Sequence, residues 1–200
     1  MEFLIITGLS GAGKSRAADV LEDLDYYCVD NMPVALMPRF AELCVATKGR
    51  YERVALVTDV REKDGFDQLL TTLDQLNTMD CNCRILYMDA DEATLVKRYK
   101  ESRRRHPLQT RGGTVEDAIR REQELLAPVK QRADFIVNSS SLTLGMLQNR
   151  LFTLFAGSGR KREIDVTVMS FGYKHGLPMD ADLVFDARFL PNPYYVDDLR

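Results

Sequence analysis

The sequence predicts a three-layer α/β domain built on a mainly parallel sheet of five strands. Two observations lead to this expectation. Apolar runs typical of buried strands alternate along the chain with segments whose apolar residues recur at helical spacing. The chain of 200 residues is 45% hydrophobic, which is enough for a sizeable core in one domain, or in one domain and a fragment.

The first apolar run, residues 3–7, leads into a glycine-rich loop that reads Gly8-Leu9-Ser10-Gly11-Ala12-Gly13-Lys14-Ser15, and a helical pattern follows. This order fits the phosphate-binding P-loop, Gly-x-x-x-x-Gly-Lys-Ser/Thr, between a strand and a helix. The glycines allow backbone N–H groups to point at one anion, and the helix adds the positive end of its dipole. We expect Lys14 to reach the β- and γ-phosphates of a nucleotide and the Ser15 hydroxyl to ligate Mg²⁺. A glycine-rich turn without a ligand is the alternative.

The second predicted strand, residues 26–29, ends in a polar turn that contains Asp30, Asn31 and Pro33. Ligands of open α/β sheets bind at the carboxyl ends of the strands, so Asp30 and Asn31 are candidates to face a substrate. Both residue types are also ordinary caps of a helix, and a helix is expected around residues 34–45. The sequence leaves these two interpretations open.

Two aspartates compete for a role in metal binding. The third strand, residues 53–58, ends at Asp59, and the fourth, residues 84–88, ends at Asp89. An aspartate at the tip of a strand beside a P-loop is the Walker B arrangement, in which the carboxylate orients Mg²⁺. We prefer Asp59, because Arg61 follows it and is suited to pair with a phosphate in bidentate fashion. An ion pair between Asp59 and Arg61 on the loop is the alternative.

An amphipathic helix over residues 66–76 precedes the fourth strand, and a strongly basic helix follows that strand. The charge cluster consists of Lys97, Arg98, Lys100, Arg103, Arg104, Arg105 and His106. Such a run is most often a solvated helix face. Alternatively, Arg98, Arg103, Arg104 and Arg105 form a lid over phosphates, or the cluster binds nucleic acid. Tyr99, the aromatic residue within the cluster, is one of the apolar positions expected to seat the helix, so base stacking has no support.

The remaining segments complete the predicted domain. Thr114 and Asp117 resemble a capping box at the start of a helix that Pro128 is expected to end or bend. A fifth strand over residues 135–138 and a helix over residues 144–155 follow. We predict a nucleotide-binding domain over residues 1–156, a linker over 157–162 and the beginning of an incomplete second domain over 163–200. In that last part, Ile164, Val166 and Val168 alternate as in a strand.

The charge balance and the cysteines narrow the function classes. With 27 basic and 30 acidic side chains the formal net charge is -3, so no global attraction to nucleic acid or anionic membranes is expected. Of the four cysteines, Cys81 and Cys83 form a pair without a second pair or a nearby histidine, so we expect reduced cysteines rather than a metal site. The sequence shows neither a targeting pattern nor a membrane-spanning run, which predicts a cytoplasmic protein without membrane association.

Several motifs in a fixed order carry a resemblance to a known family. Besides the P-loop, these are Leu21-Glu22-Asp23, Tyr27-Cys28-Val29-Asp30-Asn31-Met32-Pro33, Asp59-Val60-Arg61, Arg98-Tyr99, Arg104-Arg105-His106-Pro107-Leu108, Arg132-Ala133-Asp134, Ser170-Phe171-Gly172-Tyr173-Lys174-His175-Gly176 and Phe189-Leu190-Pro191-Asn192-Pro193. Along essentially the whole chain, the sequence resembles the RapZ/YvcJ family of bacterial nucleotide-binding proteins, also called RNase adapter proteins.

The resemblance implies a P-loop kinase-like fold that binds and hydrolyses ATP and GTP with Mg²⁺. It implies a nucleotide site at residues 8–15 and at a second stretch, Asp59, Val60, Arg61 and Glu62. Some members bind small regulatory RNA and deliver it to an endoribonuclease under control of an amino-sugar phosphate, mostly through the C-terminal domain. Because this chain stops shortly after Pro193, we expect the nucleotide site here and not the RNA or sugar-phosphate site.

The sequence is therefore compatible with three function classes. The first is a nucleotide-binding regulatory protein with slow ATPase or GTPase activity that depends on Lys14 and Asp59. The second is a small-molecule or nucleotide kinase with an arginine-rich lid. The third is an adapter with a small RNA and a ribonuclease as partners, and a homo-oligomer is compatible with each class. We prefer the first, because no acceptor pocket can be read from the sequence.

Overall fold

The computed structural model of the protein describes residues 1–47, 51–59, 63–79, 82–156, 166–179, 181–186 and 188–190. The chain divides into two compact units, Met1–Lys161 and Arg162–Arg200. The predicted linker, residues 157–162, lies outside the described residues. The predicted domain limits at residues 156 and 163 therefore stay predictions.

The first unit is built on a parallel sheet of five strands in the order β2-β3-β1-β4-β5. The strands are β1 (Glu2–Gly8), β2 (Tyr27–Val29), β3 (Arg53–Val57), β4 (Asn82–Asp89) and β5 (Phe135–Asn138). The predicted α/β class with a five-stranded parallel sheet is thus confirmed. The central strand, β1, lies between β3 and β4, and its residues from Phe3 to Ile6 are fully buried. A strand covered on both faces has no polar side, which explains the continuous apolar run in the sequence.

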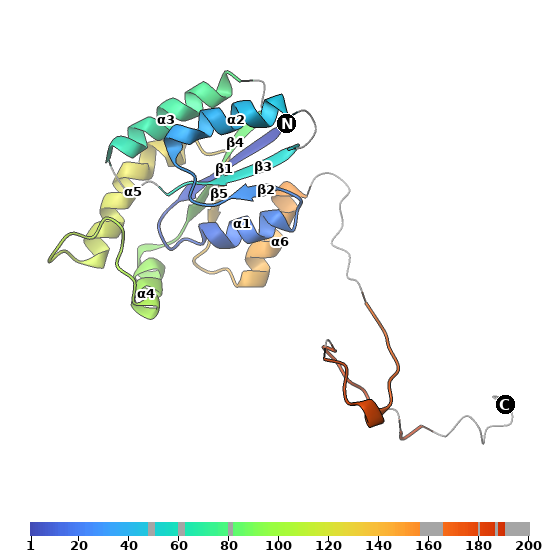
Figure 1. Ribbon diagram of the computed structural model, residues 1–200. Coiled ribbons are helices and arrows are strands. Elements are labelled where there is room, and N and C mark those ends of the chain that lie inside the picture. The colour runs from blue at the N-terminus through green and yellow to red at the C-terminus, as the bar shows by residue number, and fades with distance from the viewer. Residues whose placement is uncertain are drawn as a thin grey trace. The chain divides into compact units, whose positions relative to one another are not determined.

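Helices cover both faces of the sheet, as Figure 1 shows. They are α1 (Lys14–Glu22), α2 (Met37–Ala46), α3 (Lys63–Asn77), α4 (Glu92–Ser102), α5 (Val115–Gln131) and α6 (Leu144–Phe155), with a short 3-10 turn, η1 (Val34–Leu36), before α2. On one face α1 packs beside α6, and on the other α2 packs beside α3. α5 contacts both α3 and α4. None of the helices in the described part of the chain is long and apolar enough to span a membrane.

The two ends of α5 differ in detail from the prediction. Thr114 Oγ1 accepts a hydrogen bond from the Asp117 N–H at 3.1 Å, and the Thr114 hydroxyl donates to the Asp117 carboxylate at 2.7 Å. In a full capping box the acidic side chain would instead reach back to the N-cap N–H. Pro128 does not end the helix, which continues to Gln131. Pro128 is exposed, and the helix continues past it although proline provides no N–H for the carbonyl group one turn earlier.

In the second unit, the prediction of a strand from Ile164, Val166 and Val168 is wrong for the residues that the structure describes. Residues 166–170 belong to no strand, and the side chains of Val166 and Val168 are 75% and 89% exposed; Ile164 lies outside the described residues. A strand forms only beside a partner strand, and the described residues of this unit provide none. Their regular structure is a 3-10 turn, η2 (Tyr173–His175).

Candidate functional site

The P-loop (residues 8–15) leaves the sheet at the carboxyl end of its central strand. Its three glycines, Gly8, Gly11 and Gly13, have φ angles of 128°, 85° and 102°, which side-chain-bearing residues rarely adopt. At Gly8 a Cβ atom would also lie 2.0 Å from the Met88 carbonyl oxygen. The neighbouring Leu9 N–H donates to that same oxygen at 3.0 Å. Backbone contact thus holds the start of the loop against β4, and glycine alone fits there.

The backbone of the P-loop presents unused hydrogen-bond donors. α1 begins at Lys14, and the first N–H groups of a helix have no partner within that helix. In the part of the chain that the structure describes, the N–H groups of Gly11, Gly13, Lys14 and Ser15 donate to no protein acceptor. The Ser15 side chain is exposed as well. Such donors at the positive end of a helix dipole form an arrangement that binds anions.

The Lys14 side chain lies across this loop. Its Nζ donates to the carbonyl oxygens of Gly8 at 2.8 Å and of Leu9 at 3.3 Å, and it lies 3.2 Å from Asp59 Oδ1. Asp59 follows β3, which pairs with β1, so the sheet brings this carboxylate to the P-loop from a distant part of the sequence. The side chains of Lys14 and Asp59 are only 9% and 22% exposed. The ammonium group of Lys14 and the carboxylate of Asp59 therefore lie together at the edge of the sheet, partly shielded from water.

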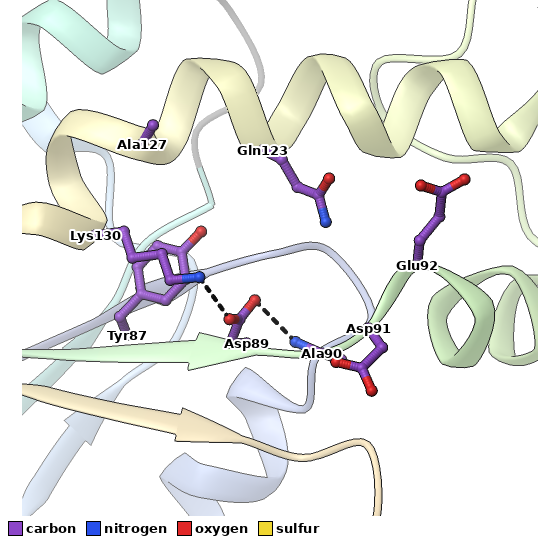
Figure 2. A pocket seen from close by; sticks show the side chains of 8 residues that line it. All are labelled: Tyr87, Asp89, Ala90, Asp91, Glu92, Gln123, Ala127 and Lys130. Carbon is purple, nitrogen blue, oxygen red and sulfur yellow. Dashed lines mark hydrogen bonds and ion pairs between the residues drawn. The ribbon is translucent and has the colours of Figure 1, made fainter.

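Asp89, the second candidate for metal binding, lies at the end of β4 and is engaged elsewhere. Figure 2 shows that its carboxylate accepts from Lys130 Nζ at 2.7 Å and from the Ala90 N–H at 3.0 Å. It lines a pocket of about 470 Å³ between the end of β4 and α5. The other residues that line this pocket are Tyr87, Ala90, Asp91, Glu92, Gln123, Ala127 and Lys130. Lys14 therefore pairs with Asp59, while Asp89 pairs with a lysine of α5.

Arg98 of the predicted lid contacts the P-loop directly. From α4 it donates through Nη1 to the Gly11 carbonyl oxygen at 2.9 Å and through Nη2 to the Ser139 carbonyl oxygen at 2.9 Å. Ser139, in the loop after β5, donates from its hydroxyl to the Ala12 carbonyl oxygen at 2.7 Å. α4 and the loop after β5 thus hold the P-loop together from one side.

The other predicted lid residues, Arg103, Arg104 and Arg105, are exposed and lie where α4 ends and just beyond it. Arg103 is the C-cap of α4, with a positive φ of 53°. Within the described ranges, no hydrogen bond or ion pair joins these three guanidinium groups to the protein. Arg98 is therefore the predicted lid residue that the structure brings to the P-loop.

Glu122 of α5, which the sequence does not predict as a site residue, binds the P-loop. Its carboxylate accepts from the Ser10 N–H at 2.9 Å and from the Ser10 hydroxyl at 2.6 Å. Ser10, expected as a nucleotide ligand, therefore directs both donors into the protein. The sequence does contain a sign of this contact. Glu122 shares the buried face of α5 with Ile119 and Leu126, and a charged residue within an apolar stripe needs a buried partner.

Asp30 and Asn31 follow β2 and are exposed at the carboxyl edge of the sheet. The Asn31 N–H donates to Asp30 Oδ1 at 2.7 Å, and Asn31 has a positive φ of 52°. The helix-capping interpretation of these residues is wrong, because Pro33 is the N-cap of η1 and Leu36 that of α2. The reason is that the chain needs a sharp turn after β2 before the next helix can begin.

Part of the predicted site lies outside the described residues, namely Val60, Arg61 and Glu62, together with Cys81. Within the described ranges, Cys28 and Cys44 form no disulfide. Among the residues that the structure describes, no three His, Cys, Asp or Glu side chains are grouped to hold a metal ion. A Mg²⁺ site with few protein ligands needs no such group, because phosphate oxygens and water complete it.

Comparison of the sequence with known proteins identifies the family of this chain. Residues 1–159 match the family model of the RapZ-like N-terminal domain, and residues 164–200 match that of the RapZ C-terminal domain. The chain belongs to the RapZ family. A nucleotide-binding protein of Caldicellulosiruptor bescii is 46% identical over 100% of this chain, and one of Heliobacterium modesticaldum is 47% identical, also over 100%. The matches cover 69% and 66% of these relatives, so the chain spans about two thirds of their length.

A solved structure supports the fold of this RapZ family member. Shikimate kinase from Acinetobacter baumannii, in complex with shikimate, superimposes with a TM-score of 0.52 at 14% sequence identity. The match covers 80% of this chain and 96% of that chain. At this identity the likeness concerns the fold alone, and it agrees with the P-loop kinase-like fold that the resemblance implied.

Proposed function

We propose that this chain binds the phosphates of ATP or GTP at the P-loop. The observation that carries the proposal is the group of unused N–H donors at the start of α1, beside the Lys14 ammonium group. Donors held in place by a rigid loop bind an anion with little reorganisation. The two relatives described above are named nucleotide-binding proteins, which supports the same class of ligand.

Mg²⁺ would accompany the nucleotide, with Ser15 and Asp59 as its protein ligands. The Ser15 side chain is exposed beside the loop, and the Asp59 carboxylate lies next to Lys14. Both offer oxygen atoms, the ligand that Mg²⁺ prefers, so the residues present fit this ion. When bound, the ion neutralises charge on the phosphates. Asp89 is not proposed for this role, because its ion-pair partner is Lys130 of α5, whereas Asp59 lies 3.2 Å from the lysine of the P-loop.

We further propose that bound nucleotide is hydrolysed slowly. Lys14 would stabilise the charge that grows on the transferred phosphoryl group, and Asp59 would hold the metal or order the attacking water. To reach a γ-phosphate, Lys14 gives up hydrogen bonds to the carbonyl oxygens of Gly8 and Leu9 and its pairing with Asp59. These competing contacts favour slow turnover, which suits a protein that senses nucleotide.

A kinase that phosphorylates a small molecule or a nucleotide is the second candidate. The exposed Asp30 and Asn31 at the carboxyl edge of β2 favour it, because this edge is where an acceptor would lie. A screen of nucleoside monophosphates and sugars with ATP separates the two functions. Transfer well above background hydrolysis favours the kinase, whereas hydrolysis without transfer favours the regulatory protein.

The adapter role concerns the whole protein. The resemblance supports a cytoplasmic regulator, open to homo-oligomer formation, with a small RNA and a ribonuclease as partners through the C-terminal domain. RNA affinity should fall steeply with salt if the basic helix contacts phosphates. Undetectable or salt-insensitive binding by this chain, together with binding by a full-length relative, would assign the RNA site to the C-terminal domain.

Calorimetric titration of ATP and GTP, with and without Mg²⁺, tests the proposal. Lys14→Ala should weaken binding by on the order of tenfold or more, because it removes a charge-assisted contact to phosphate. Lys100→Ala, an exposed lysine of α4, is the matched control and should bind like the wild type. Equal binding by the wild type and Lys14→Ala would exclude the P-loop as the site. Asp59→Asn should reduce the effect of Mg²⁺ on binding, and Asp89→Asn should not.

A further inference from the structure

A buried line of hydrogen bonds connects the P-loop to α5 and to the segment after α4. Glu122 and His106 are 1% and 2% exposed, and Ser10 is 5% exposed. Besides its two contacts with Ser10, the Glu122 carboxylate lies 3.2 Å from His106 Nε2. Polar groups at this depth are held in place by their partners, because an unpaired one is costly to bury.

The direction of these hydrogen bonds follows from one backbone group. The Leu108 N–H donates to His106 Nδ1 at 3.2 Å, which leaves the ring proton on Nε2. His106 therefore donates to Glu122 Oε2, which also accepts from the Ser10 N–H, while Oε1 accepts from the Ser10 hydroxyl. Three donors thus converge on one carboxylate.

We infer that Glu122 is a positioning residue that fixes the P-loop in the conformation that binds phosphate. This inference rests on the proposed function. Ser10 lies between Gly8 and Gly11, two residues with positive φ angles. By turning the Ser10 N–H inward, Glu122 sets the course of the loop, so that the following N–H groups stay available to an anion. Glu122 acts through Ser10 rather than on the nucleotide itself, since its side chain is 1% exposed and both of its oxygens accept from Ser10.

The same line of contacts leads to the exposed arginines. His106 directly follows Arg103, Arg104 and Arg105, and the ring of Tyr99 packs against it with 5.1 Å between ring centroids. Because His106 and Ser10 share one carboxylate, phosphate binding at the P-loop should also stabilise residues 103–108. Coupling of this kind is reciprocal, so an anion bound by these arginines should strengthen nucleotide binding.

Two substitutions of Glu122 distinguish positioning of the P-loop by hydrogen bonds from an effect of the negative charge of Glu122. Glu122→Gln keeps the shape: its carbonyl oxygen can accept from the Ser10 N–H and from His106, while its NH₂ group donates to the Ser10 hydroxyl, which then acts as acceptor. Glu122→Ala leaves those buried groups without partners. Glu124→Ala, an exposed residue on the same helix, is the matched control.

Hydrogen exchange in residues 8–15 and 103–108 is measured together with nucleotide affinity, with the protected N–H groups of Leu9, Ser10, Ala12 and Leu108 as reporters. Glu122→Ala should speed exchange of both segments in the absence of nucleotide and weaken binding by on the order of tenfold. Glu122→Gln should restore both properties to within about threefold of the wild type, because it makes the same number of hydrogen bonds. Glu124→Ala should change neither property.

The inference is overturned if Glu122→Ala exchanges and binds like the wild type, or if Glu122→Gln is as impaired as Glu122→Ala, which would indicate a role of charge. If Glu122→Ala does not fold, Ser10→Ala replaces it, since that change removes only the hydroxyl contact and should still speed exchange of the P-loop. A wild type that binds no nucleotide refutes the proposed function alone, because exchange in the absence of nucleotide still tests the positioning.

Discussion

Gly8→Ala should destabilise the first unit strongly, even in the absence of any ligand. The new Cβ would lie 2.0 Å from the Met88 carbonyl oxygen and 2.6 Å from the Met88 nitrogen. Both atoms belong to the backbone of β4, so no change of side-chain rotamer relieves the overlap. The φ angle of 128° adds strain for any residue with a Cβ.

The size of this effect can be worked out by comparison with Gly13. Gly13 has a φ of 102° but no atom within 4 Å of the position of a Cβ, so Gly13→Ala carries the backbone strain alone. Strain of this kind costs about 1–3 kcal/mol. Gly8→Ala must also push β1 away from β4 and break the hydrogen bond between Leu9 and Met88, which adds about 1–3 kcal/mol. The total, about 2–6 kcal/mol, is a large part of the free energy of unfolding of an ordinary domain.

Urea unfolding followed by circular dichroism, without nucleotide, measures the three relevant variants. Gly145→Ala is the control, since this glycine lies in α6 with open space around it. Because alanine favours the helix, this variant should have a free energy of unfolding that is about 0.5–1 kcal/mol higher than that of the wild type. The expected order of stability is Gly145→Ala, wild type, Gly13→Ala and then Gly8→Ala. The reasoning is refuted if Gly8→Ala is as stable as Gly13→Ala.

Three further predictions concern other parts of the first unit. Thr114→Ala should lower the free energy of unfolding by about 1 kcal/mol in thermal denaturation, because it removes the side-chain cap of α5. The Thr114 hydroxyl also lowers the pKa of Asp117, so the resulting stabilisation is present above the ordinary aspartate pKa and is lost as the pH falls through the lowered value. Asp117→Asn should therefore flatten the acid limb of the stability profile, and an unchanged limb would contradict this. Burial raises the pKa of the Cys28 thiol to about 12, so alkylation at pH 8, followed by mass spectrometry, should be about a thousandfold slower than in the unfolded chain.

The sequence predicts well those elements whose pattern is local. β1 is an uninterrupted apolar run because both of its faces are buried, and the P-loop has residue types that its backbone angles demand. The helix over residues 144–155 agrees with the observed bounds of α6, whose Thr143 cap accepts from the Met146 N–H at 3.3 Å. Each of these features can be recognised from neighbours in the sequence, so no knowledge of the tertiary structure is needed.

Features that depend on distant partners could not be predicted in this way. Glu122 and Ser10 are 112 positions apart, and nothing near either residue says which side chain it will meet. Its position in the sequence places His106 in the basic cluster, yet it is buried against Glu122. Val166 and Val168 alternate with other residues as in a strand. Such alternation predicts which face of a strand the apolar side chains would share, but a strand also needs a partner strand, and the described residues of this unit provide none.

The contacts that shape the P-loop have a consequence for the synthesis of this protein. The groups that hold the loop come from Met88, Arg98, Glu122 and Ser139, all of which the ribosome makes long after the loop itself. Until β3 and β4 have emerged from the ribosome, the apolar β1 has no neighbouring strands. Its exposed side chains can then bind chaperones or cause aggregation. A parallel sheet of such distant pairings also folds slowly. The P-loop should therefore be among the first segments translated and among the last to reach its final form.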